Sequence, residues 1–533
     1  MLGMARGNEA YGNVNRRWKA ACRAIFGKEI GELEEYKQWL CRDKRPVLRG
    51  KSGISGNEVV CSYPYAKGGK LVAFDEVDFF KKGTPLKDSE LSGLGSIALA
   101  MRGRATYCGN IVLGNSMNVK DCTSMVDCLD AYGSEQFAFS KGMGYACEGT
   151  YNESAFGCNG LGYSSFIIRG FGVYKSSRCL ELSRCDACSD CHFSHGLSNC
   201  RDCLFCFNLK NARHCVGNAQ LSPPEYAKAK ARIFGEIVAR LEKDRELPSL
   251  NEIAEGAKPD FSALRGESGK VKLEDKGKTD KGRIERAFQE TTAIVLGKRH
   301  EGIDDYGAWL SEYSIGLTQA KSCASGAGLQ LPEYSNYMKF PGDRLLSMEE
   351  ADALGERLWL RKEEAMGLSL ANAGKALAGI AFFSPEWKIG KRMNIIDSPL
   401  NIDSTDCYRS ILAIESKCCA HSYIARNAEN VFGVYYSRLS SFVLRCSQSV
   451  KLSRCFECDS CRDCTDCYFC HNCENVHDSM FCFNAKNLRY AIGNAEMPRE
   501  KYMEVKKRVL DGINRRLEKR HGLNVGIFTL GRG

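Results

Sequence analysis

The cysteines of this chain follow a period of three residues. Residues 101–215 and 401–491 together hold 25 cysteines, and 22 of them share a single phase of a three-residue repeat. The other members of that phase, which includes Cys122 and Cys215, are nearly all small or apolar, and Asn152 is the clear exception. Because the phase excludes charge over many triplets, we expect it to point into a core.

Few structures can maintain a period of three residues. An α-helix repeats every 3.6 residues and a flat strand every two. Collagen repeats every three residues, but its repeated residue is glycine. A solenoid of short strands and tight corners can hold this register, since each coil contacts only its neighbours. We therefore predict a mainly β fold with a β-solenoid of three- or six-residue period, and the coil geometry stays open.

The residue just before the inward phase is repeatedly Asn or Asp. These two residue types tolerate a left-handed backbone and form local hydrogen bonds, as a sharp corner requires. The positions are Asp190, Asn199, Asp202, Asn208, Asn211, Asp463, Asp466, Asn472, Asn475, Asp478, Asn484 and Asn487. We predict a left-handed corner at each of them.

The chain resembles itself along its whole length. Three motifs recur in the same order: FGKEIGELEEYKQWL at 26–40 and LGKRHEGIDDYGAWL at 296–310, LSRC at 182–185 and 452–455, and FCFN at 205–208 and 481–484. The first two pairs are 270 residues apart and the third is 276 apart. A fixed order and spacing predict a tandem duplication, with six residues inserted in the Cys-rich stretch of the second copy.

Each copy is expected to carry helical caps on its solenoid. Ser222-Pro-Pro-Glu reads as a capping box with proline at the first helical position, and the apolar stripes Tyr226, Ile233, Ile237, Leu241 and Tyr502, Val509, Ile513, Leu517 read as packing faces. The predicted organisation is a cap region at 1–106, a Cys-rich solenoid at 107–221, a capping helix at 222–243, a flexible linker at 244–283, a second cap region at 284–400, a second solenoid at 401–496, and a basic capping helix and tail at 497–533. With its own caps, residues 1–245 should fold alone.

Several of these segments together resemble a known family. FGKEIGELEEYKQW, the CxxC-rich repeat and the ending Cys215-Val-Gly-Asn-Ala-Gln-Leu-Ser-Pro-Pro-Glu-Tyr are similar to cysteine-rich CxxC repeat proteins of candidate-phylum microbes. Members of that family carry an EELEFYKK-like segment, zinc-ribbon CxxC pairs and a C-terminal N-K-x-Y-S-K-E-E-Y-like segment. The resemblance implies no activity. This chain departs from the family at the zinc ribbon, where only Cys41 and Cys61 remain.

The overall composition is typical of a globular protein. No stretch reaches the roughly 18 apolar residues of a membrane span. The first residues show no apolar core of a secretory signal, so we expect a cytoplasmic location with free or metal-bound thiols. The net charge is +10, and residues 499–533 carry ten Lys and Arg against four Asp and Glu, which is +6 of that total.

The densest candidate site is a run of seven cysteines spaced three apart: Cys455, Cys458, Cys461, Cys464, Cys467, Cys470 and Cys473. CxxC is the knuckle of zinc sites, and CxxCxxC opens the bacterial iron–sulfur pattern. Free cysteine also packs as a small buried hydrophobe. We favour a packed thiol row, with zinc or iron–sulfur binding and reversible disulfides between neighbouring coils as the alternatives.

Two further groups of residues are candidates. His192, His195, His471 and His477 follow the inward phase, so we expect them to face solvent, where they are candidates for metal ligands or general bases. The basic helix carries Lys506, Lys507, Arg508, Arg515, Arg516, Lys519 and Arg520, a pattern that suits nucleic acid or an anionic surface. The more common role of such a charge run is a solvated helix face.

Motifs that would define an enzyme are missing from the sequence, which contains no P-loop, no G-x-S-x-G and no HExxH. The sequence therefore predicts a non-enzymatic β-solenoid scaffold or binding protein without a required cofactor. Its partner would be a protein or a second copy that docks on solenoid faces. A metal or thiol-redox protein and a nucleic-acid-associated factor remain the alternatives.

Overall fold

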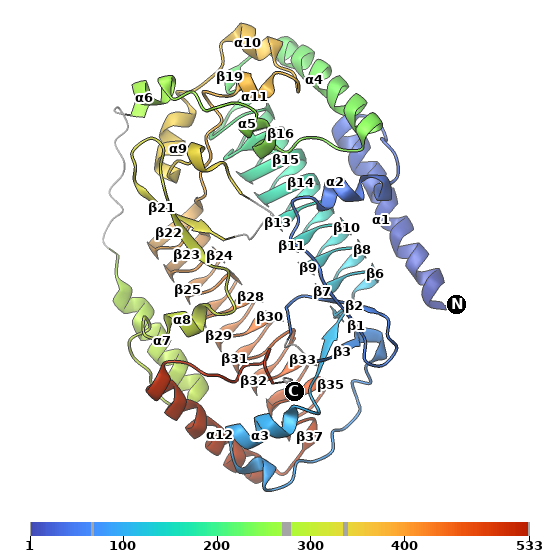
Figure 1. Ribbon diagram of the computed structural model, residues 1–533, viewed down its shortest axis with the longest axis vertical. Helices are drawn as coiled ribbons and strands as arrows, with labels where there is room; N and C mark the ends of the chain where they lie inside the picture. Colours follow the sequence, from blue (N-terminus) through green and yellow to red (C-terminus); the bar gives the residue numbers. More distant parts are fainter. Residues whose placement is uncertain (1, 66–68, 269–278, 334–338, 531–533) are drawn as a thin grey trace. The chain divides into compact units, whose positions relative to one another are not determined.

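The chain forms two compact units, and each unit combines three separate stretches of chain (Figure 1). The computed structural model describes residues 2–65, 69–268, 279–333 and 339–530. Unit 1 consists of Met1–Pro46, Val112–Asp275 and Thr318–Trp387, and unit 2 consists of Val47–Ile111, Lys276–Leu317 and Lys388–Gly533. Both units are rich in strands with flanking helices, as the sequence predicts at this level.

Most strands of unit 1 belong to one array, called array 1 here. Its strands are β5 (Val112–Leu113), β6 (Met117–Lys120), β7 (Thr123–Val126), β8 (Leu129–Tyr132), β9 (Glu135–Ala138), β10 (Lys141–Gly144), β11 (Cys147–Thr150), β12 (Glu153–Phe156), β13 (Asn159–Gly162), β14 (Ser165–Tyr174), β15 (Ser177–Asp186), β16 (Ser189–His195), β17 (Arg201–Leu204), β18 (Arg213–Val216) and β19 (Ala219–Gln220). The strand pairings described in it are parallel except the last, where β19 folds back on β18.

Unit 2 contains the corresponding array 2. Its strands are β22 (Trp387–Ile396), β23 (Leu400–Tyr408), β24 (Leu412–Ile414), β25 (Lys417–Ala420), β26 (Ile424–Arg426), β27 (Glu429–Phe432), β28 (Tyr435–Arg438), β29 (Ser441–Leu444), β30 (Ser447–Val450), β31 (Ser453–Phe456), β32 (Thr465–Tyr468), β33 (His471–Glu474), β34 (His477–Met480), β35 (Phe483–Lys486), β36 (Ala491–Ile492) and β37 (Ala495–Glu496). It also ends in an antiparallel turn, from β36 to β37.

Helices and small sheets flank the arrays. Unit 1 has α1 (Leu2–Phe26), α2 (Lys37–Cys41), α4 (Pro223–Asp244), α5 (Leu250–Glu255), α6 (Ser262–Ser268), α9 (Met348–Gly355), α10 (Lys362–Gly367), α11 (Ala373–Ala376) and the strands β20 (Leu317–Lys321) and β21 (Gly328–Pro332). Unit 2 has β1 (Leu48–Lys51), β2 (Glu58–Cys61), β3 (Lys70–Ala73), α3 (Leu94–Met101), β4 (Thr106–Gly109), α7 (Lys281–Leu296), α8 (Gly307–Ser311) and α12 (Arg499–Arg520). Figure 1 shows α1 running along array 1.

Apart from β5 and β7, whose paired residues are 13 positions apart, the parallel pairings described within the arrays join residues that are 12 positions apart. Thr123 of β7 pairs with Glu135 of β9, and Thr465 of β32 pairs with His477 of β34. Because 12 is a multiple of three, residues of the inward phase stay in line from strand to strand. The inward phase therefore forms two separate cores, one inside each array, as the cysteine period predicts. Asn152 lies in the core of array 1 and satisfies its amide there, donating to Leu161 O at 3.3 Å and accepting from Ser164 N at 3.1 Å.

The backbone is left-handed at every third residue of long stretches of both arrays. All twelve Asn and Asp positions expected to form corners have positive φ, for example Asp190 at 53° and Asn475 at 53°, so that prediction is confirmed. Larger residues also occupy such positions, including Tyr145 at 53° and Phe193 at 50°. A left-handed residue with a Cβ costs roughly 1–2 kcal/mol. Backbone hydrogen bonds on both sides offset this cost, as at Phe205, whose N–H donates to His192 O.

The predicted capping helices are present at the ends of the arrays. Helix α4 starts after Ser222, whose capping box pairs it with Glu225, and Pro223 occupies the first turn. The predicted packing stripes of α4 and α12 are buried, for example Ile233 and Ile513. Among the described helices, none combines the length and apolar character that a membrane crossing requires.

The two halves of the chain exchange segments, which the sequence did not predict. Residues 47–111, called cover segment 1, belong to unit 2, and residues 318–387, called cover segment 2, belong to unit 1. The expectation that each half completes its own caps therefore needs correction, and the folding of residues 1–245 alone stays a prediction. Nothing in the periodicity of a segment indicates which of two similar arrays it will pack against.

The contacts made by the two cover segments correspond to one another. Asn208 Nδ2 of array 1 donates to Phe382 O at 2.9 Å, and Asn484 Nδ2 of array 2 donates to Thr106 O at 2.8 Å. Ser384 N donates to His195 Nε2 at 3.0 Å, and Cys108 N donates to His471 Nε2 at 2.8 Å. In each case the equivalent residues differ by 276 positions.

Two buried ion pairs show the same offset. Arg169 pairs with Glu181 in unit 1, and Arg445 pairs with Glu457 in unit 2, again at an offset of 276. The LSRC match at 270 is therefore displaced by half of the 12-residue register. A sequence alignment can slip by six residues here because the slip preserves the inward phase.

The segment expected to be a flexible linker contains ordered structure. Residues 244–283 include α5, α6 and the start of α7, and Leu250 and Ile253 are buried. Residues 269–278 of the expected linker lie outside the described residues. Ser249 caps α5 by accepting a hydrogen bond from Glu252 N, a local signal that the polar composition of the segment obscured.

The segment exchange predicts a crossed pattern of hydrogen-exchange changes. Asn208→Gly removes the side-chain donor to Phe382 while glycine keeps the left-handed backbone. We expect amide exchange to accelerate several-fold around residues 380–386 and to stay unchanged around residues 104–110. Asn484→Gly should give the converse result in the full chain, measured by mass spectrometry. Acceleration around 104–110 in the Asn208 variant would show that the cover segments are not exchanged.

Candidate binding pocket and buried thiol rows

The seven candidate metal ligands lie in the interior of array 2. Cys455, Cys458, Cys461, Cys464, Cys467, Cys470 and Cys473 have no exposed surface and belong to one apolar core. All 29 cysteines of the chain are free thiols, and only Cys41 and Cys323 are partly exposed. Among the described residues, no group of three or more histidine, cysteine, aspartate or glutamate side chains is arranged to hold a metal ion.

Each inward thiol serves backbone carbonyls. Cys458 Sγ donates to Phe456 O at 3.6 Å and to Cys467 O at 3.4 Å. Cys461 repeats this pattern, with acceptors two residues before it and nine residues after it. Buried carbonyl groups need hydrogen-bond donors, and cysteine is a small apolar residue with a weak S–H donor. This explains why cysteine suits the inward phase.

Serine performs the same task at other inward positions. Ser164 Oγ donates to Gly162 O at 2.9 Å and to Val173 O at 3.4 Å, and it accepts from Ser176 N at 3.1 Å. Cysteine and serine thus satisfy their polar atoms inside the core in the same way, and most of the other inward positions are filled by apolar side chains.

Burial also suppresses thiol reactivity. It raises the pKa of Cys122 and Cys158 to about 12, and it raises the pKa values of Cys464 and Cys473 well above the ordinary range. The thiolate is the form that attacks electrophiles and binds metals. These four thiols are therefore protonated at neutral pH. Against the effect of burial, hydrogen bonds from neighbouring thiols lower the pKa of Cys455 to about 5 and the pKa values of Cys461 and Cys470 well below the ordinary range.

Two substitutions of one inward thiol should separate the effect of packing on stability from the effect of a buried charge. Cys461→Ser keeps a small donor, so we expect a loss of about 1 kcal/mol in unfolding free energy. Cys461→Asp must neutralise its carboxyl at pH 7, which requires a pKa shift of roughly three units and costs about 4 kcal/mol. Thermal melting followed by circular dichroism measures both. Equal losses for the two variants would mean that this phase is not a dry core.

Three of the four histidines expected at the surface are buried instead. His192, His195 and His471 have almost no exposed surface, and His477 is half-buried. The correction has a simple cause: helices and cover segments lie over the strand faces that a bare array would expose. His195, for example, bonds to Ser183 Oγ at 2.9 Å and to Ser384 N.

Burial opposes the protonation of three histidines. Desolvation lowers the pKa of His192 and His195 to about 3 and that of His421 to about 4. Neither ring nitrogen of His192 has a hydrogen-bond partner among the described residues, and the ring packs against Phe234 at a centroid distance of 4.8 Å. All three side chains are thus neutral in the folded protein.

Stability should decrease as the pH drops below about 6.5. The unfolded histidines take up protons near pH 6.5 and the folded ones do not, so the stabilisation is complete above that pH and is lost as the pH falls toward 4. Each histidine contributes up to about 1.4 kcal/mol per pH unit in this window. His192→Leu should make the pH dependence of the melting temperature shallower. An unchanged slope would show that His192 is protonated in the fold.

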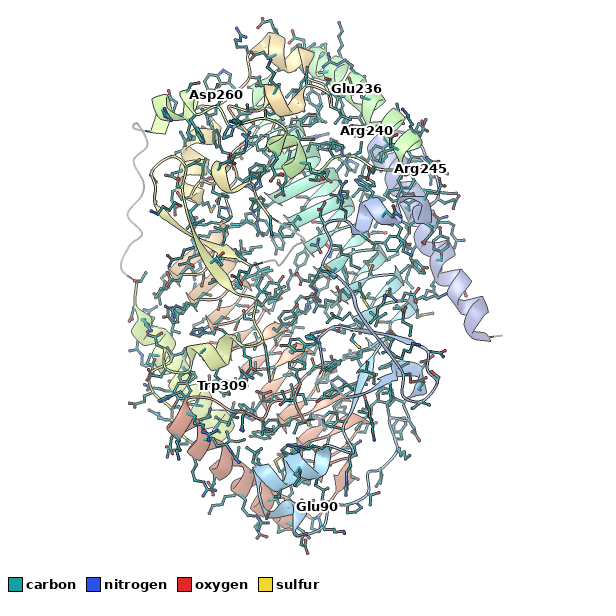
Figure 2. All side chains as sticks on the ribbon, in the orientation of Figure 1. Glu90, Glu236, Arg240, Arg245, Asp260 and Trp309 are labelled. Carbon is teal, nitrogen blue, oxygen red and sulfur yellow. The ribbon has the colours of Figure 1, made fainter. Side chains whose placement is uncertain are left out.

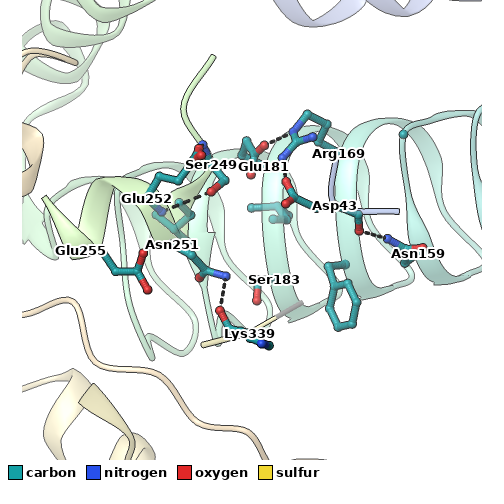
Figure 3. Close-up of a pocket in the computed structure, with 15 residues that line it drawn as sticks. Asp43, Asn159, Arg169, Glu181, Ser183, Ser249, Asn251, Glu252, Glu255 and Lys339 are labelled. Atoms are coloured by element: carbon teal, nitrogen blue, oxygen red, sulfur yellow. Dashed lines mark hydrogen bonds and ion pairs between the residues drawn. The ribbon is translucent and has the colours of Figure 1, made fainter. Parts of the chain in front are cut away.

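A buried ion pair fastens the N-terminal helices to array 1. Arg169 Nε donates to Glu181, Nη1 donates to Trp39 O at 2.6 Å, and Nη2 bonds to Asp43. The guanidinium is therefore held on three sides, and the ion pairs raise its pKa despite burial. Figure 3 shows this cluster on the wall of a pocket.

Unit 2 contains an equivalent buried ion pair that has different neighbours. Arg445 Nε donates to Glu457 at 2.5 Å, Nη2 bonds to Glu312 at 2.8 Å, and Nη1 donates to Trp309 O. Trp309, labelled in Figure 2, lies on α8. Tyr313 and the chain after α12 also reach this ion pair. The equivalent space in unit 1 stays open.

The open space in unit 1 is a pocket of about 300 Å³. It is lined by residues of array 1, by Asp43, and by the segment around α5. Its walls include the carboxylates Asp43, Glu181, Glu252 and Glu255, the cations Arg169 and Lys339, the polar side chains Asn159, Ser183, Ser249 and Asn251, and the aromatic ring of Phe171. A site of this kind can bind a small polar molecule.

Sequence analysis missed the ion pairs and the pocket. A signal for the pairs exists: an arginine and a glutamate 12 residues apart recur as Arg169, Glu181 and Arg445, Glu457 at the offset of the FCFN motif. The pocket has no such signal, because its walls come from stretches that are far apart in the sequence.

The basic helix residues lie on α12. Lys507, Arg508, Arg515, Lys519 and Arg520 are exposed, and Lys506 and Arg516 are half-buried. The Lys506 ammonium sits 4.9 Å from the centre of the Tyr468 ring, and Arg516 donates to Gly512 O. Arg508, Arg515 and Arg516 also line a cavity of about 770 Å³ with Lys298 and the start of α3.

Comparisons with known proteins add no relative. Searches with family models, against curated proteins and against solved structures each returned no match to the chain. The geometry of the sites is therefore the basis for the function proposed next.

Proposed function

We propose that the chain is a tandemly duplicated β-solenoid that acts as a scaffold or binding protein without catalytic activity. The 12-residue register supports a coil of four triplets, and the left-handed residue before each inward side chain supports a corner at each triplet. Equivalent hydrogen bonds at an offset of 276 support the duplication. The resemblance to CxxC repeat proteins stays a prediction.

One observation carries the functional part of this proposal. The thiols that would do chemistry are buried and bonded to backbone carbonyls, whereas side chains on the outside of the arrays form aligned rows. Phe139, Tyr151 and Tyr163 stack at 5.0 Å intervals, and both tyrosines are exposed. Regular external rows of this kind suit a docking surface for a protein partner or a second copy.

The metal or thiol-redox alternative uses the Cys455–Cys473 row. It would require thiolates and ligands that converge on one centre, whereas the thiols here donate to carbonyls two residues before them and nine residues after them. The proposal of a cytoplasmic protein also rests on these thiols, since a reducing compartment would keep all of them free. Zinc or an iron–sulfur cluster would be the cofactor of this alternative.

The nucleic-acid alternative has one observation in its favour. The exposed cations of α12 continue into the cavity lined by Arg508, Arg515 and Arg516, which concentrates positive charge on one helix. Asp511 and Glu518 line the same cavity and reduce this charge. We therefore rank this alternative second to the scaffold.

Thiol titration and metal analysis test the proposal together. In anaerobically purified full-length protein, we expect no stoichiometric zinc or iron. We expect at most Cys41 and Cys323 to react with Ellman's reagent before denaturation, and all 29 thiols to react afterwards. A stoichiometric metal that is lost in a Cys458→Ser, Cys461→Ser variant would replace the scaffold with the metal-binding alternative.

A further inference from the structure

The two buried arginine–glutamate pairs differ in what completes them. Glu457 Oε2 accepts hydrogen bonds from Tyr313 OH at 2.6 Å and from Ile527 N at 2.8 Å. Glu181 uses one carboxylate oxygen for Arg169, and its other oxygen has no donor among the described residues. Glu181 is only 7% exposed. Because Glu181 lines the pocket, this oxygen is available to a donor that enters the pocket.

The missing donors have clear structural causes. Asp43 follows Trp39 at the spacing by which Tyr313 follows Trp309, and Asp43 bonds to Arg169 where Tyr313 bonds to the glutamate. After α4, the chain forms the capped helix α5, whereas after α12 residue Ile527 reaches Glu457. Unit 1 therefore keeps an open pocket of about 300 Å³ at the place that unit 2 fills with its own chain.

The pocket has the charge of a cation site. Four carboxylates and two cations line it, and Arg42 pairs with Glu252 at 3.2 Å, which leaves a formal net charge of −1. The charge of Arg169 is included in this sum, and its donors are already used by three acceptors. Glu255 at the end of α5 is exposed and lies across the pocket from Glu181 in Figure 3. Ammonium and guanidinium groups form the strongest hydrogen bonds to such carboxylates.

We propose that the pocket beside Arg169 and Glu181 binds a small organic cation with a primary amine or guanidinium group. One cationic group donates to the free oxygen of Glu181, and Glu255 attracts positive charge at the rim. The volume of the pocket suits a molecule of amino-acid size. This inference names a ligand class for the proposed binding function, and it rests on that proposed function. The same chemistry is available from a free diamine or from a lysine or arginine side chain of a partner protein.

Calorimetry on the full chain tests the proposal with 1,4-diaminobutane and 1-amino-4-guanidinobutane, and with 1,4-butanediol as the neutral control. We expect saturable binding of at least one cation and none of the diol. Glu181→Gln should weaken binding at least ten-fold, and Glu255→Gln several-fold. Glu457→Gln is the matched control, because it removes the charge from the equivalent buried pair in unit 2 without touching the pocket. Both Glu181→Gln and Glu457→Gln should lower the melting temperature.

Two results would overturn the proposal: no saturable binding of either cation, or equal weakening by Glu181→Gln and Glu457→Gln. The scaffold proposal is judged separately, since unreactive thiols and absent metal would leave it standing when cation binding fails. A capped Gly-Lys-Gly peptide distinguishes the sources. Tighter binding of the peptide than of 1,4-diaminobutane assigns the site to a protein side chain, and the reverse order assigns it to a free cation.

Discussion

The fold depends on the hydrogen bonds inside the arrays. A backbone that turns left-handed at every third residue places carbonyl groups at the core, where backbone N–H groups of neighbouring segments and some inward side chains donate to them. The inward side chain must fit the core without leaving an unsatisfied polar group. Cysteine and serine do so by donating to carbonyls, and alanine, valine and leucine do so because they are apolar. Burial in these cores also raises the pKa of inward thiols such as Cys122 and Cys158.

Around these cores, each array is held by contacts with distant parts of the chain. The Arg169 and Arg445 pairs fix α2 in unit 1 and α8 in unit 2 to strand residues, and they do so with several hydrogen bonds from each guanidinium. A buried ion pair contributes little net stability but is costly to break, so it fixes one arrangement over its alternatives. The exchanged cover segments add a second constraint, because His195 and His471 each receive an N–H donor from the other half of the chain.

Sequence reasoning predicted what repeats locally and missed what depends on distant packing. The three-residue phase, the left-handed Asn and Asp positions and the two capping helices are encoded in neighbouring residues, and the structure agrees with them. The burial of His192 and the exchange of the cover segments depend on elements more than a hundred residues away or on helices laid over the strands. LSRC recurs at an offset of 270, whereas the Arg–Glu pairs recur at 276. The sequence alone could not show which offset relates equivalent positions, because both keep the inward residues in phase. The pocket at Glu181 exists because one segment forms α5 instead of filling it.

The exchanged cover segments impose an order on synthesis. Array 1 is complete at residue 220, but the segment that covers His195 and Phe207 ends only at residue 387. At roughly 5–20 residues per second, a ribosome needs about 8 to 30 seconds to supply it. During that interval the nascent chain presents an unfinished array whose aromatic and histidine side chains await partners. A chain released early would carry array 1 without its cover, so a truncation in the second half would also damage the first.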